Sequence, residues 1–119
     1  MLKVNVLCAV VALMFSGVAH ADDSSSGDYW LSVCQSSDPI EETQCLSYVL
    51  GVWDGLVVAG TAAKTKSDIC SPKRVSARQL AEIFVKYARA SHEVRHMSGR
   101  VLIVASFMGA FPCRDGIGD

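Results

Sequence analysis

The stretch from Asp38 to Lys64 constrains the fold most, because it predicts one long helix that is apolar on most of its sides. Asp38 can accept hydrogen bonds from first-turn amides, Pro39 suits the first helical position, and Glu41 stands where a capping-box carboxylate would. Apolar residues then recur at helical spacing, at Leu46, Val49, Leu50, Trp53, Leu56 and Val57. Such a helix needs cover on most sides, so we expect it at the centre of a small all-α bundle of about four helices.

Each glycine in this helix lowers its stability by about 1 kcal/mol relative to alanine. Gly51 and Gly55 are four residues apart, so both open on one helix face and allow another backbone to come close. That backbone belongs either to another segment of the chain or to a second copy of it. Trp53-Asp54-Gly55 resembles a ligand-binding motif, but we interpret Trp53 as a residue that packs in the core.

The first residues predict a secretory signal peptide over residues 1–21. Lys3 gives a short positive region, Val4 to Val18 is apolar, and Ala19-His20-Ala21 is a cleavage site. The apolar run is short for a membrane span. We therefore expect cleavage after Ala21, no membrane association after cleavage, and a single periplasmic domain over residues 22–119.

Cysteine usage supports export. Cys8 should leave with the signal peptide, which leaves an even set of four: Cys34, Cys45, Cys70 and Cys113. Cys34 and Cys45 flank the turn between the first two helices, and Cys70 and Cys113 open and close the second half of the chain. We predict these two pairings over the other connectivities, with the small bundle stapled by both disulfides.

Three further helices are predicted around the long one. A short first helix carries Tyr29, Trp30 and Val33 on one face, and a last helix carries Met97, Val101, Val104, Met108 and Phe111 on one stripe. Between them, Ser76-Ala-Arg-Gln79 is a capping-box pattern. The helix that follows has Leu80, Ile83, Phe84 and Tyr87 on one face and Arg78, Glu82, Lys86 and Arg89 on the other.

Charge is unevenly distributed along the chain. From Asp22 to Ala63 there are acidic residues but no Lys or Arg, whereas basic residues predominate from Lys64 onward. The two halves either neutralise each other or form faces of opposite sign, one of which steers a partner. The overall formal charge of −1 argues against general nucleic-acid binding.

The residues His92-Glu93-Val94-Arg95-His96 match the H-E-x-x-H pattern. On an α-helix, two histidines four apart bind zinc and the glutamate activates a water. A catalytic zinc needs a third protein ligand, and no other histidine follows the predicted cleavage site. We interpret the segment as a polar corner between two helices or as a partner-contact loop, and we expect no metal and no cofactor.

Several landmarks together resemble a known family. They are Cys45-Leu-Ser-Tyr48-Val-Leu-Gly51-Val-Trp-Asp54-Gly55, Cys70-Ser-Pro72 leading into Val75-Ser76-Ala-Arg-Gln79-Leu80, Tyr87, the His92-Glu93 corner, and Ala110-Phe111-Pro112-Cys113. This set is similar to the Rap1a/Tai family of periplasmic immunity proteins.

The resemblance implies a helical, disulfide-bonded inhibitor, commonly a homodimer, and not an enzyme. Its partner would be a peptidoglycan amidase effector of a type VI secretion system, whose active-site groove it blocks. Two alternatives of other classes stay open. One is a small periplasmic chaperone of the acid-stress type, and the other is a zinc peptidase that uses His92, Glu93 and His96.

An inhibitor of a groove enzyme needs a protruding polar segment on a rigid scaffold, because ordering the segment opposes binding. The corner between the third and fourth helices fits best, with His92, Glu93, Arg95 and His96 as partner-binding residues. The loop from Lys64 to Asp68, with Lys64 and Lys66, is the second choice.

Overall fold

The computed structural model describes residues 25–63 and 69–113, and within these ranges the protein is built from α-helices. The elements run in the order α2 (Gly27–Gln35), α3 (Pro39–Ala63), α4 (Ala77–Ala90), the 3₁₀ turn η2 (His92–Val94) and α5 (Gly99–Ala110). The predicted all-α bundle of about four helices is confirmed. No helix in the described part of the chain is both long enough and apolar enough to cross a membrane. The predicted signal peptide lies outside the described residues.

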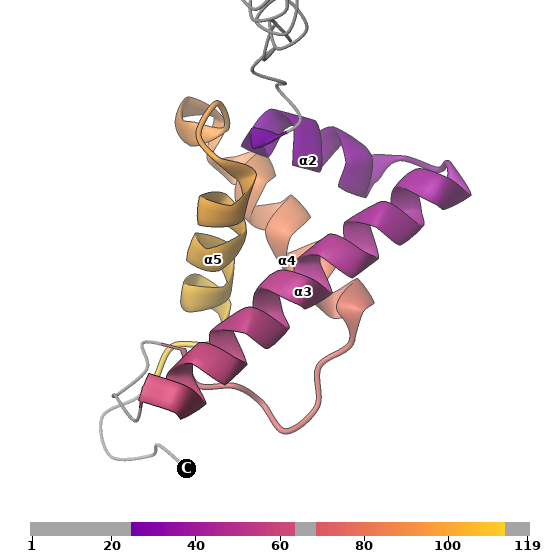
Figure 1. Cartoon of the computed structure of the whole chain (residues 1–119). Helices are drawn as coiled ribbons and strands as arrows, with labels where there is room; N and C mark the ends of the chain where they lie inside the picture. The colour runs from indigo at the N-terminus through magenta and orange to yellow at the C-terminus, as the bar shows by residue number, and fades with distance from the viewer. Residues whose placement is uncertain (1–24, 64–68, 114–119) are drawn as a thin grey trace, which may run out of the picture.

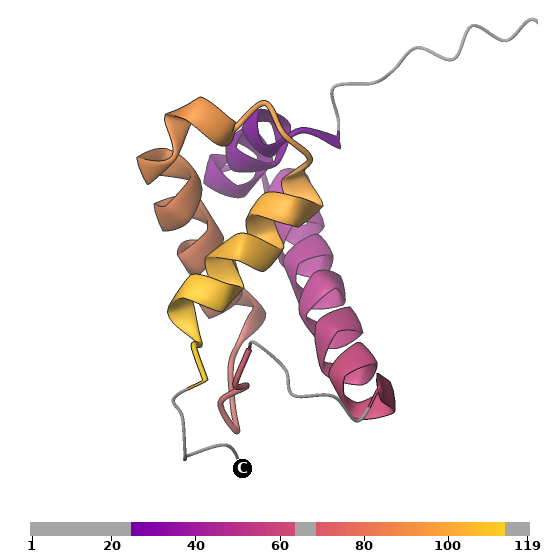
Figure 2. The same cartoon turned by 90° about the vertical axis from the view of Figure 1, so that its left-hand side faces the viewer.

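All four helices share one core, and each of them contacts the other three. In Figure 1, α3 crosses the front of the molecule, with α2 at the top, α5 at one side and α4 behind. Figure 2 shows α5 in front, between α4 and α3. The most fully buried side chains come from three of the helices: Cys45, Val49, Leu80, Phe84, Ile103 and Phe107. Trp30 stacks on Tyr48 with ring centroids 3.7 Å apart, which joins α2 to α3.

The start of α3 agrees with its sequence signature in all but one detail. Asp38 Oδ1 accepts hydrogen bonds from the amides of Ile40 (2.8 Å) and Glu41 (3.1 Å), as a cap should. Glu41 does not reach back to Asp38, because the Asp38 amide already donates to Ser36 Oγ at 3.1 Å. The capping box at Ser76 and Gln79 is complete in both directions.

The prediction that α3 is covered on most sides is wrong for the single chain. Val49 and Trp53 are buried, and Leu46 and Leu56 pack against the core. Leu50 and Val57, which the predicted stripe included, are exposed, and Val58 is 66% exposed. The reason is geometric, since three shorter helices can cover only one side of a helix of 25 residues.

Helix α4 follows its predicted amphipathic pattern. Leu80 and Phe84 are buried, and Ile83 and Tyr87 pack against the core. The small residues Ala81 and Ala88 complete the buried face. The charged residues Arg78, Glu82, Lys86 and Arg89 are exposed on the other face.

The stripe predicted for the last helix is not the buried face of α5, although Phe111 at its end packs against the core. Val101 and Met108 are exposed, as is Met97 just before the helix. The buried face consists instead of Gly99, Leu102, Ile103, Ser106 and Phe107. Because α5 is apolar on nearly all sides, its periodicity does not select a face, and contacts with other helices decide which residues are buried.

The contact that orients α5 is made at its first residue. A Cβ added to Gly99 would collide with Trp30 Cδ1 and lie 3.1 Å from the carbonyl oxygen of Ser26. The start of α2 is equally crowded, since a Cβ on Gly27 would collide with the side chain of Leu102 and lie 2.8 Å from the Arg95 carbonyl oxygen. Ser26 and Ser98 form an isolated antiparallel bridge between the two helix starts. Two Ser-Gly helix starts therefore pack directly against each other.

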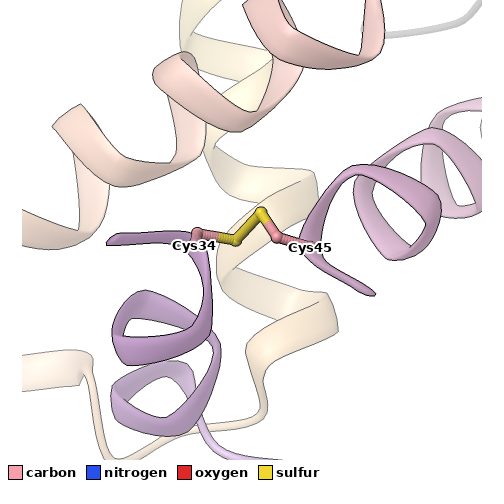
Figure 3. The surroundings of a disulfide bond; sticks show 2 residues. All are labelled: Cys34 and Cys45. Atoms are coloured by element: carbon pink, nitrogen blue, oxygen red, sulfur yellow. A yellow bond between two sulfur atoms is a disulfide. The ribbon is translucent and has the colours of Figure 1, made fainter. Parts of the chain in front are cut away.

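Both predicted disulfide pairings are confirmed. Cys34 and Cys45, with Cα atoms 5.0 Å apart, join the end of α2 to the second turn of α3 (Figure 3). Cys70 and Cys113, with Cα atoms 4.9 Å apart, join the segment before α4 to the segment after α5. Loop-closure entropy assigns about 3 kcal/mol to the first bridge and about 4 kcal/mol to the second. Beside the second bridge, the Cys70 amide donates to the Phe111 carbonyl oxygen at 2.9 Å.

The tight packing at Gly99 gives a prediction with a matched control. Gly99→Ala should lower the free energy of unfolding by about 1–3 kcal/mol, because its methyl group has to displace the Trp30 ring. Gly109, also in α5, has nothing within 4 Å of an added Cβ. Gly109→Ala should therefore be neutral or stabilise the protein by up to about 1 kcal/mol. Urea unfolding of both variants measures the difference, and equal effects would contradict the packing described.

Candidate functional site

The corner between α4 and α5, residues 91–98, brings together the residues that the sequence favours for partner binding. The chain leaves α4 at Ala90, makes the η2 turn and enters α5 at Gly99. The Val94 amide donates to the Ser91 carbonyl oxygen at 3.2 Å, and the Met97 amide donates to the Val94 carbonyl oxygen at 2.9 Å. Val94 packs against the core, which anchors the middle of the corner.

Hydrogen bonds from the first turn of α2 also fix the backbone of the corner. The first amides of a helix have no partner within the helix. In α2, the Gly27 amide donates to the Met97 carbonyl oxygen at 2.8 Å and the Asp28 amide to the Arg95 carbonyl oxygen at 2.9 Å. The Tyr29 amide donates to Ser26 Oγ at 3.1 Å. The corner backbone thus completes the cap of α2, and both views show it beside the start of that helix (Figures 1 and 2).

Arg95 is directed toward the protein itself. Its Nε lies 3.4 Å from Asp28 Oδ1, and its side chain is 30% exposed. The contact is a charge interaction rather than a hydrogen bond, because the buried Nε–H group has no acceptor at hydrogen-bonding geometry. Arg95 therefore binds the corner to α2 through its charge as well as through its carbonyl group.

His92, Glu93 and His96 are exposed on the same corner. They provide two imidazoles and one carboxylate on a backbone fixed at both sides, so little ordering is needed when a partner binds. Met97, which is 43% exposed, adds an apolar group next to them. The arrangement suits polar contact with a cleft in another protein.

The geometry at H-E-x-x-H is not that of a zinc-binding helix. That motif needs an α-helical turn to place two histidines on one face. Here the 3₁₀ turn η2 spans His92–Val94, and Arg95 and His96 lie in a turn. In the described residues, no group of three or more His, Cys, Asp and Glu side chains could hold a metal ion.

The second predicted partner-binding segment cannot be placed. Lys64 and Lys66, with the rest of the loop up to Asp68, lie outside the described residues. Lys73 and Arg74, farther along the same connection, are exposed.

The predicted packing residues of α3 divide into two groups. Trp53 is buried and makes edge-to-face contacts with Phe107 (centroids 5.4 Å apart) and Phe111 (5.2 Å), so its interpretation as core packing is confirmed. Gly51 and Gly55 are exposed, and an added Cβ at either would meet nothing within 4 Å. The close approach expected at these glycines is thus not made by another part of the described chain.

Charge neutralisation between the two halves is incomplete. Arg78 Nη2 lies 2.6 Å from Glu42 Oε1, and Arg95 contacts Asp28. Within residues 25–63 and 69–113, the basic residues Lys73, Arg74, Lys86, Arg89 and Arg100 have no ion pair. The exposed surface of α4 and the segment before it are consequently rich in free cations.

Sequence reasoning did not identify Asp28, Gly27 or Gly99 as residues that hold the corner. A usable signal was present, because a Ser-Gly pair precedes or begins each of α2 and α5. Glycine is the usual residue where another group comes close to the backbone. The repeated pair could have indicated that the two helix starts pack together.

Comparison with known families identifies one match. The family model described as Rap1a immunity proteins matches residues 26–113, which includes all four helices, the corner and both disulfides. No curated protein and no solved structure matches the chain.

The corner geometry predicts that H-E-x-x-H does not bind zinc. Protein purified without chelator should carry far less than one zinc per chain by elemental analysis. Glu93→Gln should change neither the metal content nor the thermal unfolding midpoint, because the side chain is exposed and no described residue pairs with it. Stoichiometric zinc that disappears in His96→Ala would show that the histidines form a metal site after all.

Proposed function

Because the chain belongs to the Rap1a immunity protein family, we propose that it binds and inhibits a peptidoglycan amidase effector of a type VI secretion system. The observation that carries this proposal is the extent of the match, which covers the described domain from its first helix to its last cysteine. The toxin class follows from the resemblance of the sequence landmarks, and the corner supplies a rigid, exposed and polar segment suited to an enzyme cleft.

The proposed location is the periplasm, where such an effector acts on the cell wall. Residues 1–21 have the charge, apolar run and cleavage site of a secretory signal peptide. Two disulfides in so short a chain also favour an oxidising compartment. The chain would act there as a binding protein without catalysis, cofactor or nucleic-acid partner.

Inhibition is assigned to the corner through His92, Glu93 and His96. Arg95 is left out of the contact set because it holds the corner to Asp28. A cleft that cleaves peptidoglycan amides is polar, so imidazole and carboxylate groups can form hydrogen bonds inside it. The exposed Met97 would add apolar contact at the edge.

Alanine substitution of His92, Glu93 and His96 together, with Arg95 kept, tests this assignment. The probe is a purified peptidoglycan amidase effector of a type VI secretion system that the wild type binds. Affinity should fall by at least roughly 30-fold, since truncation of hot-spot residues costs about 2 kcal/mol or more. The thermal midpoint should not change, because the three side chains are exposed.

The matched control is Lys73→Ala with Arg74→Ala, two exposed residues outside the corner. This control should bind and inhibit like the wild type. If the corner variant silences the amidase with unchanged affinity, the inhibitory contact lies elsewhere. If the wild type binds no such effector, the proposed function is wrong.

We also propose that the protein forms a homodimer through the exposed face of α3. Gly51 and Gly55 lie on this face with open space above them, and Leu50, Val57 and Val58 provide exposed apolar side chains. A helix face that carries exposed apolar side chains and two glycines four residues apart permits a close crossing of two helices. A second copy would cover the side of α3 that its own chain leaves exposed.

Gly55→Leu tests the dimer. The substitution should convert a dimer into a monomer in sedimentation velocity, because the side chain keeps the helices apart. Helical circular dichroism should be retained, since nothing in the described chain meets a Cβ at this position. The control is Gly109→Leu, at another exposed helical glycine with open space around it, which should stay dimeric. A wild type that sediments as a monomer would rule out the dimer.

A further inference from the structure

A surface groove lies between α2, α3 and α4, above the Cys34–Cys45 disulfide that Figure 3 shows. Its volume is about 720 Å³. The floor is apolar and consists of the disulfide with Leu46, Ala81 and Val85. We call this hollow the α4 groove.

The two ends of the α4 groove differ in charge. At the end where α4 begins, Arg78 is paired with Glu42, so that end is neutral. At the end where α4 finishes, Lys86 and Arg89 line the groove, and neither has an ion pair among residues 25–63 and 69–113. Glu82 is the only acidic residue besides Glu42 among the lining residues. The groove therefore combines an apolar floor with a cationic end.

The cationic end leads into the corner. Arg89 and Ala90 line the groove, and η2 begins at His92, two residues farther on. The cationic end of the groove and the corner therefore lie at the same end of α4.

From this arrangement we infer that the α4 groove is a second contact site for the effector. It takes a segment of that protein that carries an apolar side chain with carboxylates on one side of it. The apolar side chain lies on Leu46 and Val85, and the carboxylates pair with Lys86 and Arg89. Free cations at one end of an apolar groove favour acidic groups over neutral or basic ones, and pairing these charges at the edge of an interface speeds association. The inference rests on the proposed function, because it concerns the same effector.

A graded pair of variants tests the charge of the groove. Lys86→Gln with Arg89→Gln removes both cations, and Lys86→Glu with Arg89→Glu reverses them. With the same purified amidase effector as the probe, affinity should fall in the first variant and fall further in the second, by roughly tenfold to hundredfold. The loss should shrink at about 0.5 M salt, where charge interactions are screened.

The matched control is Lys73→Glu with Arg74→Glu, which changes the net charge equally. These residues precede the start of α4 and are absent from the groove lining. All variants are first checked by circular dichroism and thermal unfolding. Neither should change, because the four substituted residues are exposed.

Wild-type affinity in the control together with graded loss in the groove variants supports the inference. Unchanged affinity in both groove variants overturns it and leaves the proposed function intact. Equal loss in the control also overturns it, because general charge attraction would then explain the result. A wild type that binds no such effector overturns the inference and the proposed function together.

Discussion

The structure depends on the way in which the first turn of α2 is capped. A helix of nine residues has little stability alone, and its first amides need partners. Carbonyl oxygens of Arg95 and Met97 supply two of those partners from the other half of the chain. This one joint fixes the position of α2, the path of the corner and the start of α5. The Asp28–Arg95 contact adds opposite charges to the same joint.

Glycine makes the joint possible, because the two helix starts can meet only where side chains are missing. Gly27 lies against Leu102 and the Arg95 carbonyl group, and Gly99 lies against the Trp30 ring. The exposed glycines of α3 have no such neighbours in the described chain. The same residue type thus serves internal packing at one place and leaves a surface open at another.

The sequence predicted well the features that depend on neighbouring residues or on a small number of possible pairings. The caps at Asp38 and Ser76, the amphipathic face of α4 and both cysteine pairings depend on short-range pattern or on a small number of combinations. The faces of α3 and α5 were predicted less well, because both helices are apolar around most of their circumference. For such helices, burial is decided by distant groups such as Trp30. The role of Arg95 was missed for the same reason, since its partner Asp28 is far away in the sequence.

The two disulfides divide the chain into separate covalent loops, one over residues 34–45 and the other over residues 70–113. The exposed corner lies inside the larger loop, so a protease that cuts there releases no fragment, and α4 and α5 stay linked through Cys70 and Cys113. A cut between residues 46 and 69 has a different result, because no disulfide spans that interval. The two pieces would then be held together only by noncovalent packing. The exposed corner is therefore also a segment whose cleavage leaves the chain in one covalent piece.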